Sequence, residues 1–166
     1  MKTNELTFSA VLTSLILVIE VLAAKTGESM VILTIFSTLP LYILTSKKIR
    51  LGVMSYSIVA LVLCVVNFHQ LIFFLFTNGL IGLTLGMLSK YKKALRIVVT
   101  ASMSIIGLLG VSLILGINLF GMVYKESMLV GVIIIGIIMM IYCWFYDWFA
   151  RMIDGRLNKI VKQSRG

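Results

Sequence analysis

Three side chains that can hydrogen-bond a small molecule fall within four consecutive positions of this sequence: Asn67, His69 and Gln70. Amides both donate and accept hydrogen bonds, and an imidazole does either and titrates near neutral pH. Asn118 lies at the end of a later apolar run. If helices bring these groups to one end of a bundle, they could line a pocket with apolar walls and bind a small molecule. The same positions also suit ordinary polar residues at helix ends, and the sequence leaves both interpretations open.

One carboxylate, Glu20, lies well inside an apolar run. An ionisable group within a membrane segment is costly, so Glu20 is a further candidate for binding substrate. It is also about one helical turn from the end of its run. From there it could instead reach the membrane interface or pair with Lys25, and the sequence does not choose between these roles.

The sequence lacks the motifs of common catalytic and cofactor sites. It contains one histidine and two cysteines, and Cys64 and Cys143 lie inside apolar runs without metal-ligand spacing. Phosphate-binding loops and the HExxH and GxSxG motifs are absent. The apolar runs also hold no paired carboxylates of the kind that relay protons. We therefore expect no enzyme activity, no cofactor and no metal site.

The elements that must position these residues follow from composition. Of the 166 residues, 60% are hydrophobic and 13% are charged, and the mean hydropathy is +1.10. A soluble domain carries about 25% charged residues, so this chain has too few charges to cover a surface that faces water. Soluble enzymes and ordinary nucleic-acid-binding domains are thereby excluded. The composition predicts an all-α integral membrane protein whose main partner is the lipid bilayer.

Six apolar runs approach the roughly 17–25 residues that a helix needs to cross a bilayer. They cover residues 6–24, 30–45, 51–68, 71–88, 95–120 and 128–150. The second run is short and contains Pro40, and the boundary between the third and fourth is the least distinct. The sequence thus predicts a six-helix transmembrane bundle as a single domain, residues 1–150, followed by a basic tail, residues 151–166.

The distribution of Lys and Arg predicts the orientation. If the chain crosses six times, 13 of its 15 basic residues fall on one side, Arg96 among them. Cytoplasmic connections carry an excess of Lys and Arg, so both termini are predicted to be cytoplasmic, in a bacterial cell membrane. The tail could lie along the anionic inner leaflet or be solvated. Asp147, in an aromatic cluster near the end of the sixth run, is expected to reach water or Arg151.

Two groups of small residues predict close contacts between helices. Gly79, Gly82 and Gly86 share one helix face, which suits packing within the monomer or a seam between copies. Ala10 and Ser14, four residues apart in the first run, form a second small face. This face suits either packing within the monomer or docking of a partner membrane protein.

The order of these features resembles that of known membrane protein families. After the first run come the segment 36–42 (FSTLPLY), a basic turn at 47–50 (KKIR) and the glycine-rich segment 78–88 (NGLIGLTLGML), followed by a second basic loop. Over about residues 6–120 this pattern resembles the YybS-like family of predicted membrane proteins. It is more loosely similar to the substrate-binding S components of energy-coupling factor transporters.

Similarity to the S components implies a six-helix bundle that captures a vitamin or metal ion from outside and docks to a coupling subunit and two ATPases. In that family an Ala-xxx-Ala pair on the first helix often docks the partner, and the matching positions here are Ala10 and Ser14. Its nickel and cobalt members use an N-terminal histidine, which is absent here, so a metal substrate is not expected. The family's ligand contacts come from outer loops and later helices, which here correspond to Asn67, His69, Gln70 and Asn118.

An alternative function is that of a non-catalytic scaffold or regulatory protein in cell-envelope assembly. MreD-like shape proteins have a broadly similar size and helix count. A scaffold would need no polar outer pocket. Its small-residue faces, Ala10 with Ser14 and Gly82 with Gly86, would contact other proteins.

Overall fold

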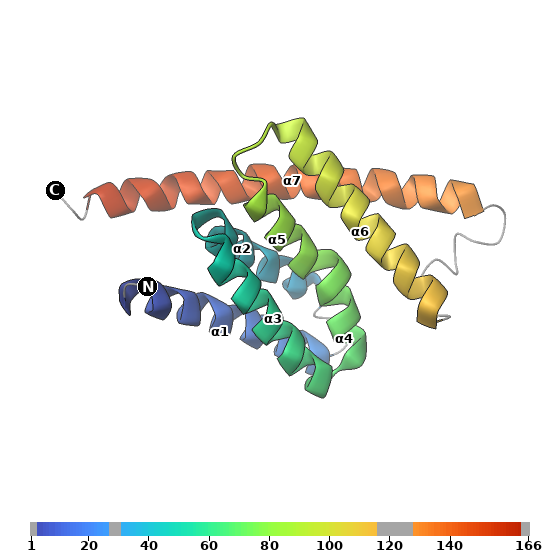
Figure 1. The fold of residues 1–166 in the computed structure, drawn as a ribbon, viewed down its shortest axis with the longest axis horizontal. Helices are drawn as coiled ribbons and strands as arrows, with labels where there is room; N and C mark the ends of the chain where they lie inside the picture. The colour runs from blue at the N-terminus through green and yellow to red at the C-terminus, as the bar shows by residue number, and fades with distance from the viewer. Residues whose placement is uncertain (1–2, 27–30, 116–127, 164–166) are drawn as a thin grey trace.

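A computed structural model describes residues 3–26, 31–115 and 128–163 of the chain. Within these ranges every regular element is a helix (Figure 1). In chain order they are α1 (Thr3–Thr26), α2 (Val31–Lys47), α3 (Ile49–Val66), α4 (Phe68–Phe73), the π-helical segment η2 (Phe74–Asn78), α5 (Gly79–Met87), α6 (Lys93–Leu115) and α7 (Met128–Gln163).

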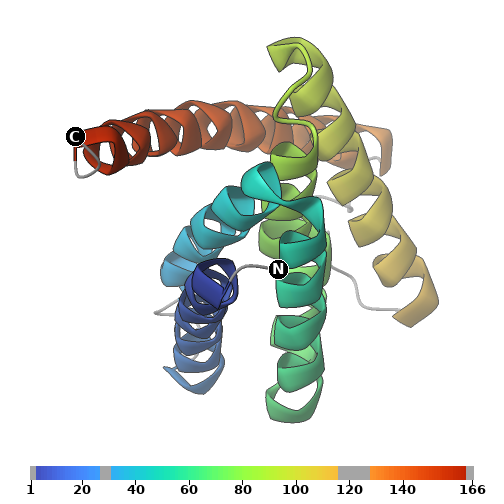
Figure 2. The ribbon, with the colours of Figure 1, turned by 60° about the vertical axis from the view of Figure 1, so that its left-hand side comes forward.

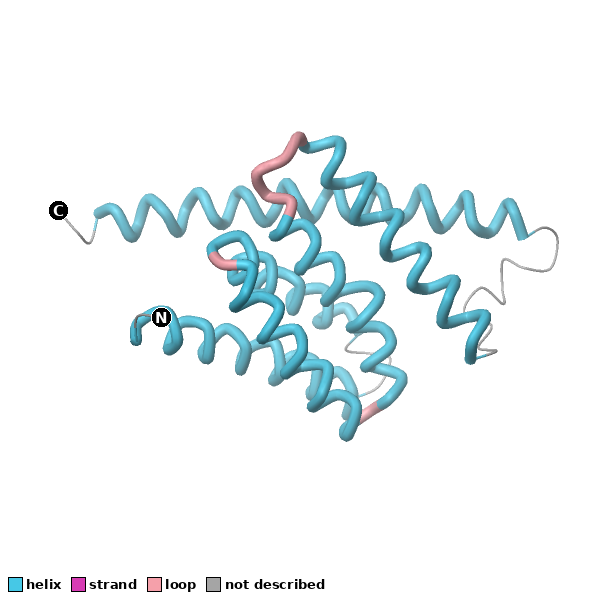
Figure 3. The backbone as a smooth tube through the Cα atoms, in the orientation of Figure 1, coloured by secondary structure: helices cyan, strands magenta, loops and turns pink. Residues whose placement is uncertain are grey.

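The helices lie where the apolar runs predict them, and their ends show local causes. A single residue, Lys48, separates α2 from α3, and Asn67 separates α3 from α4 (Figure 3). The side chain of Asn67 accepts a hydrogen bond from the Gln70 backbone N–H at 3.2 Å, so it caps the first turn of α4. After this cap, α4, η2 and α5 follow one another directly, so the fourth apolar run forms one helical unit, Phe68–Met87.

Within the described residues, five helical units are long and apolar enough to cross a membrane: α1, α3, the α4–η2–α5 unit, α6 and α7. The prediction of an all-α, multi-pass membrane protein is confirmed at this level. The helix α2, with 17 residues, is shorter than these five. Many apolar side chains on the five units are exposed, and Val65 on α3 is 89% exposed. Such a surface is stable only where lipid replaces water.

Two clusters of buried apolar side chains hold the helices together, and α2 contributes to both. One cluster joins α2, α5, α6 and α7 around Tyr42, Ile81 and Tyr146. The other joins α1, α2, α3, α4 and η2 around Ile16, Leu41 and Phe74. The short helix α2 is therefore the centre of the bundle, and the longer helices surround it.

The arrangement of the connections divides the molecule into two ends. The α2–α3 and α5–α6 connections lie toward the end where α1 begins, and the α3–α4 connection lies at the opposite end (Figure 1). Helix α7 crosses the other helices at a wide angle (Figure 2). It continues without a break from the sixth apolar run into the basic tail, as far as Gln163.

Candidate functional site

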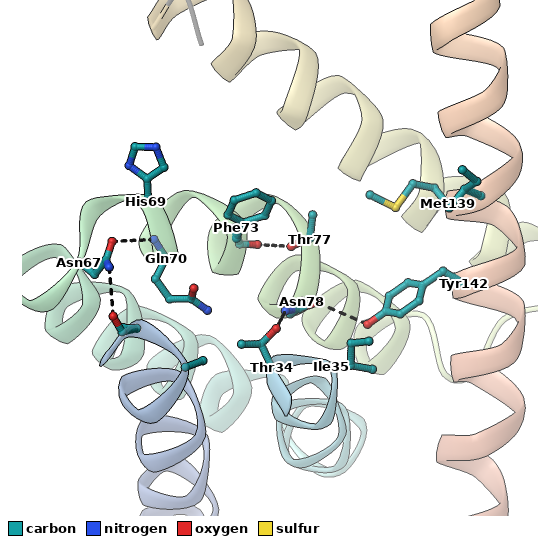
Figure 4. A pocket seen from close by; sticks show the side chains of 13 residues that line it. Thr34, Ile35, Asn67, His69, Gln70, Phe73, Thr77, Asn78, Met139 and Tyr142 are labelled. Carbon is teal, nitrogen blue, oxygen red and sulfur yellow. Dashed lines mark hydrogen bonds between the residues drawn. The ribbon is translucent and has the colours of Figure 1, made fainter. Parts of the chain in front are cut away.

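A cavity of about 550 Å³ lies near the end of the bundle that carries the α3–α4 connection (Figure 4). A volume of this size falls within the roughly 300–1,000 Å³ that is typical of sites for small molecules. Its walls come from the end of α1, the beginning of α2, α4, η2 and the middle of α7. The lining residues are Ala23, Ala24, Thr34, Ile35, Asn67, His69, Gln70, Phe73, Thr77, Asn78, Ile138, Met139 and Tyr142.

The structure brings together three of the residues that the sequence marks as candidates, because α4 presents them to the same cavity. Asn67 is held at the start of α4 by its capping bond and by a 3.4 Å hydrogen bond from its Nδ2 to the Ala24 carbonyl. Gln70 is half-buried, one turn further along. His69 is exposed at the rim of the cavity (Figure 4). Asn118 lies outside the described residues.

Glu20 is fully buried behind the cavity wall and does not line it. Its Oε1 accepts a hydrogen bond from the Ser37 hydroxyl at 2.5 Å, and its Oε2 accepts one from Gln70 Nε2 at 2.6 Å. It therefore neither faces the membrane interface nor depends on Lys25. The carboxylate fixes the orientation of the Gln70 amide, whose other polar atom remains available to the cavity.

A buried amide of the cavity lining belongs to Asn78, which the sequence marks only as the start of the glycine-rich segment. Its Nδ2 donates to Thr34 Oγ1 at 2.7 Å, and its Oδ1 accepts from the Tyr142 hydroxyl at 3.4 Å (Figure 4). Asn78 thus links α2, η2 and α7 at the base of the cavity. A signal was present in the sequence, because Thr77 and Asn78 interrupt an apolar run and polar side chains within membrane helices need partners.

The π-helical segment explains how Asn78 reaches this position. In η2 the backbone hydrogen bonds span five residues, where those of an α-helix span four. The Gly79 N–H, for example, bonds to the Phe74 carbonyl five residues earlier. This wider turn rotates the residues before and after it relative to a regular α-helix. Single-turn π segments inside α-helices occur often at functional sites. Here the segment presents both Thr77 and Asn78 to the cavity.

The cavity lining contains amides, hydroxyls and one imidazole among apolar side chains, and it contains no carboxylate, lysine or arginine. Its chemistry suits a neutral molecule with a hydrogen-bonding edge and an apolar body. Within the described ranges no three His, Cys, Asp or Glu side chains are grouped as metal ligands.

Ala10 and Ser14 are exposed on the outer side of α1, far along the helix from the cavity. They line a shallow groove of about 290 Å³ between α1 and α3, together with Leu51, Met54 and other side chains. The groove is fixed from within by a 2.6 Å hydrogen bond between the hydroxyls of Thr13 on α1 and Ser55 on α3. The small face is therefore exposed on the surface of the bundle.

The three glycines do not share one contact. A methyl group added at Gly82 would come within 2.7 Å of the Thr38 carbonyl oxygen, and one at Gly86 within 2.6 Å of Thr45 Cβ. Both therefore let α5 approach the backbone of α2. At Gly79 the added methyl group would meet the carbonyl and ring of Phe74 in the preceding π segment. Packing within the chain thus accounts for all three positions.

Arg96 is not one of the exposed cations of the connection between the fourth and fifth apolar runs, where the sequence predicts it. It lies in the first turn of α6, fully buried, and its guanidinium bonds to Asp147 Oδ2 at 2.8 Å. Asp147 is likewise fully buried and does not reach water, but the predicted contact with Arg151 is confirmed, because Arg151 Nε lies 3.7 Å from Asp147 Oδ2. The ion pair exists because α6 and α7, which are distant in sequence, pack against each other.

Comparison of this chain with protein-family models, with curated proteins and with solved structures found no match.

Proposed function

We propose that this protein is a substrate-capture subunit of a small-molecule uptake transporter, similar to the S components of energy-coupling factor transporters. The observation that carries the proposal is the cavity in which Asn67, Gln70 and Asn78 converge from separate turns. In this proposal α2 also crosses the membrane and, with the five longer units, makes six crossings. Both termini are then cytoplasmic, and the cavity opens on the outer face of the cell membrane.

The substrate is a vitamin-like nutrient that is uncharged where it contacts the protein. The neutral lining supports this class, because a charged ligand in an apolar cavity needs an opposite charge. The amides would recognise a ring or amide edge of the ligand, and Phe73, Ile138 and Met139 would cover its apolar body. Glu20 would act as a positioning residue, through Gln70.

Energy for transport would come from partner subunits, since the sequence has no nucleotide-binding motif. The groove beside Ala10 and Ser14 is the docking surface we assign to the coupling subunit. Small side chains allow close approach of helix backbones, which drives helix association in lipid. The groove lies toward the end of α1 that is predicted to be cytoplasmic, where coupling to ATPases would take place.

The cavity proposal is tested by ligand binding. The purified protein is screened against a vitamin panel by thermal unfolding and native mass spectrometry. Any ligand found is then titrated into the Asn78→Leu variant and the Asn67→Ala/His69→Ala double variant. Loss of one well-placed hydrogen bond to a buried partner costs about 1–3 kcal/mol, so each variant should weaken binding by roughly 5-fold to 150-fold.

The matched control for these variants is Cys64→Ser, since Cys64 is exposed on α3 and does not line the cavity. It should bind like the unaltered chain. Absence of any ligand across the panel, or equal affinity in the cavity variants and the control, would contradict a capture function.

The alternative, a scaffold in cell-envelope assembly, is favoured by one specific observation: the exposed Ala10 and Ser14 in the α1–α3 groove. Photo-cross-linkers placed at these two positions would distinguish the proposals. Capture of envelope-synthesis subunits supports a scaffold, whereas capture of a coupling subunit with its ATPases supports transport.

A further inference from the structure

A second hollow, of about 450 Å³, lies at the opposite end of the molecule from the candidate substrate cavity. It is formed where the α2–α3 connection meets the α5–α6 connection. Its lining residues are Thr45, Ser46, Lys47, Lys48, Ile49, Arg50, Gly86, Met87, Ser89, Lys90 and Tyr91.

The close packing of α5 on α2 creates this hollow. Gly86 lies against Thr45 so closely that an added methyl group would come within 2.6 Å of the Thr45 Cβ. This contact places Lys47, Lys48 and Arg50, around the α2–α3 connection, close to Lys90 in the α5–α6 connection. Two basic segments that are about forty residues apart in sequence thereby share one small space.

The hollow carries an excess of positive charge. Four cations line it, and Lys48 forms a 2.5 Å ion pair with Glu5. It is the ion pair that these four cations form within the described residues. Lys47 lies 4.4 Å from the centre of the Phe8 ring, which positions its ammonium group without neutralising it. Three cations therefore remain to balance an anion: Lys47, Arg50 and Lys90.

The start of α3 adds to this potential. The helix begins at Ile49, and the residue before it, Lys48, provides no side-chain cap. The first residues of α3, Ile49 and Arg50, line the hollow, so the positive end of the helix dipole lies beside the cations. The hydroxyl of Ser89 supplies an additional hydrogen-bond donor, whereas the Ser46 hydroxyl donates to the Ile43 carbonyl at 3.1 Å.

The rim of the hollow is apolar. Ile49, Met87 and Tyr91 all line it and are all exposed. A ligand that fits both the cations and this rim must carry an anionic group joined to an apolar portion. An anionic phospholipid has this combination, and basic pockets between membrane helices on the cytoplasmic side bind such headgroups.

We propose that this hollow is a binding site for the phosphate of an anionic phospholipid headgroup, with Arg50 and Lys90 as its main ligands and the acyl chains passing over Ile49 and Met87. The site is separate from the substrate cavity and does not depend on the transport proposal.

The test uses the full-length protein in a neutral detergent, titrated with phosphatidylglycerol or with phosphatidylcholine of the same acyl chains and followed by native mass spectrometry. An attraction of about 1 kcal/mol between a basic residue and an anionic headgroup is about fivefold in affinity, and we assign it to each cation that lines the hollow. The Arg50→Gln/Lys90→Gln double variant should therefore bind phosphatidylglycerol about 25-fold more weakly. Binding of phosphatidylcholine should be weak and unaffected by the substitutions.

Two matched variants separate a site from bulk charge and from loss of folding. Lys92→Gln removes a cation from the same connection but outside the hollow, so its affinity should change less than twofold. Arg50→Lys/Lys90→Arg keeps both charges and should restore most of the binding. Thermal unfolding establishes that each variant is folded.

Three outcomes would overturn the proposal. One is equal affinity of the chain for the two lipids. Another is a loss in Lys92→Gln as large as that in the double variant, which would indicate net charge alone. The third is that inorganic phosphate binds the chain directly and displaces phosphatidylglycerol completely, which would indicate a site for free phosphate.

Discussion

Glu20 and Asp147 are both fully buried carboxylates, and each has partners of a different kind. Glu20 accepts hydrogen bonds from two neutral side chains, Ser37 and Gln70, whereas Asp147 is paired with a buried guanidinium. Both arrangements follow from the same constraint, because a buried polar group without a partner costs free energy that the fold must supply elsewhere. Their contributions to stability should therefore differ in a measurable way.

Replacing Glu20 by alanine should destabilise the protein by about 1–3 kcal/mol, because the Ser37 hydroxyl and the Gln70 amide lose their common acceptor. The measurement is equilibrium unfolding in detergent. Glu5→Ala on the same helix is the control, since its ion pair with Lys48 is partly exposed and such pairs contribute at most about 1 kcal/mol. Equal effects of the two substitutions would show that Glu20 is not the organising acceptor described above.

Replacing Asp147 by asparagine should cost about 3–5 kcal/mol, because it leaves the buried Arg96 guanidinium without a compensating charge. The double substitution Arg96→Met/Asp147→Leu removes both charges and should recover most of this loss. Arg151→Gln, which alters the exposed neighbour, should have little effect. The measurement is a double-mutant cycle of unfolding free energies for the unaltered chain, Arg96→Met, Asp147→Leu and the double variant. Additive losses would show that Arg96 and Asp147 do not interact.

At the level of elements, the contact between α2 and α5 is the axis of the fold. The short α2 is surrounded by the other helices, and Gly82 and Gly86 bring α5 against its backbone. This contact positions the cavity at one end, through Thr34 and Asn78, and the basic hollow at the other. A helix of 17 residues can have this central role because protein covers it on most sides.

Gly82→Ala should destabilise the protein by about 1–3 kcal/mol, because the added methyl group would come 2.7 Å from the Thr38 carbonyl and force α5 away from α2. Gly110→Ala on α6 is the matched control, since no atom lies within 4 Å of its added methyl group. That substitution should be neutral or slightly stabilising. Thermal unfolding of the pair would contradict the α2–α5 contact if Gly82→Ala were as stable as Gly110→Ala.

On the scale of the whole molecule, the chain places polar, neutral groups at one end and cations at the other. The cavity lies near the α3–α4 connection, and the basic hollow lies where the α2–α3 and α5–α6 connections meet. Positive connections remain in the cytoplasm. This is the orientation we propose: the basic hollow faces the cytoplasm, the cavity faces outward, and α2 crosses the membrane together with the five longer units.

Reporter fusions test this orientation directly. Fusions after Arg50, after Lys93 and at the carboxyl end should all report a cytoplasmic location, and one after Gln70 should report the outside. The physical reason is the concentration of Lys and Arg near the first three positions. An external signal from any of the first three fusions would remove both the six-crossing topology and the outward-facing cavity.

The sequence alone determined that the chain is an all-α membrane protein, and it located the helices closely, because hydropathy and the length of apolar runs are local properties. It also grouped Asn67, His69 and Gln70, which lie on one helical turn and its cap. It did not determine which faces of the helices meet, since large apolar side chains lie both in the core and on the exposed surface of the helices.

Only the tertiary structure decided the rest of the cavity and the state of the buried charges. Thr34, Asn78 and Tyr142 meet from three separate elements, and the π segment that presents Asn78 has no sequence pattern that would distinguish it from a regular helix. Arg96 belongs to the basic stretch by sequence, and only the packing of α6 on α7 brings it to Asp147. Contacts between distant segments depend on how whole helices fit together, which the local pattern of residue types does not encode.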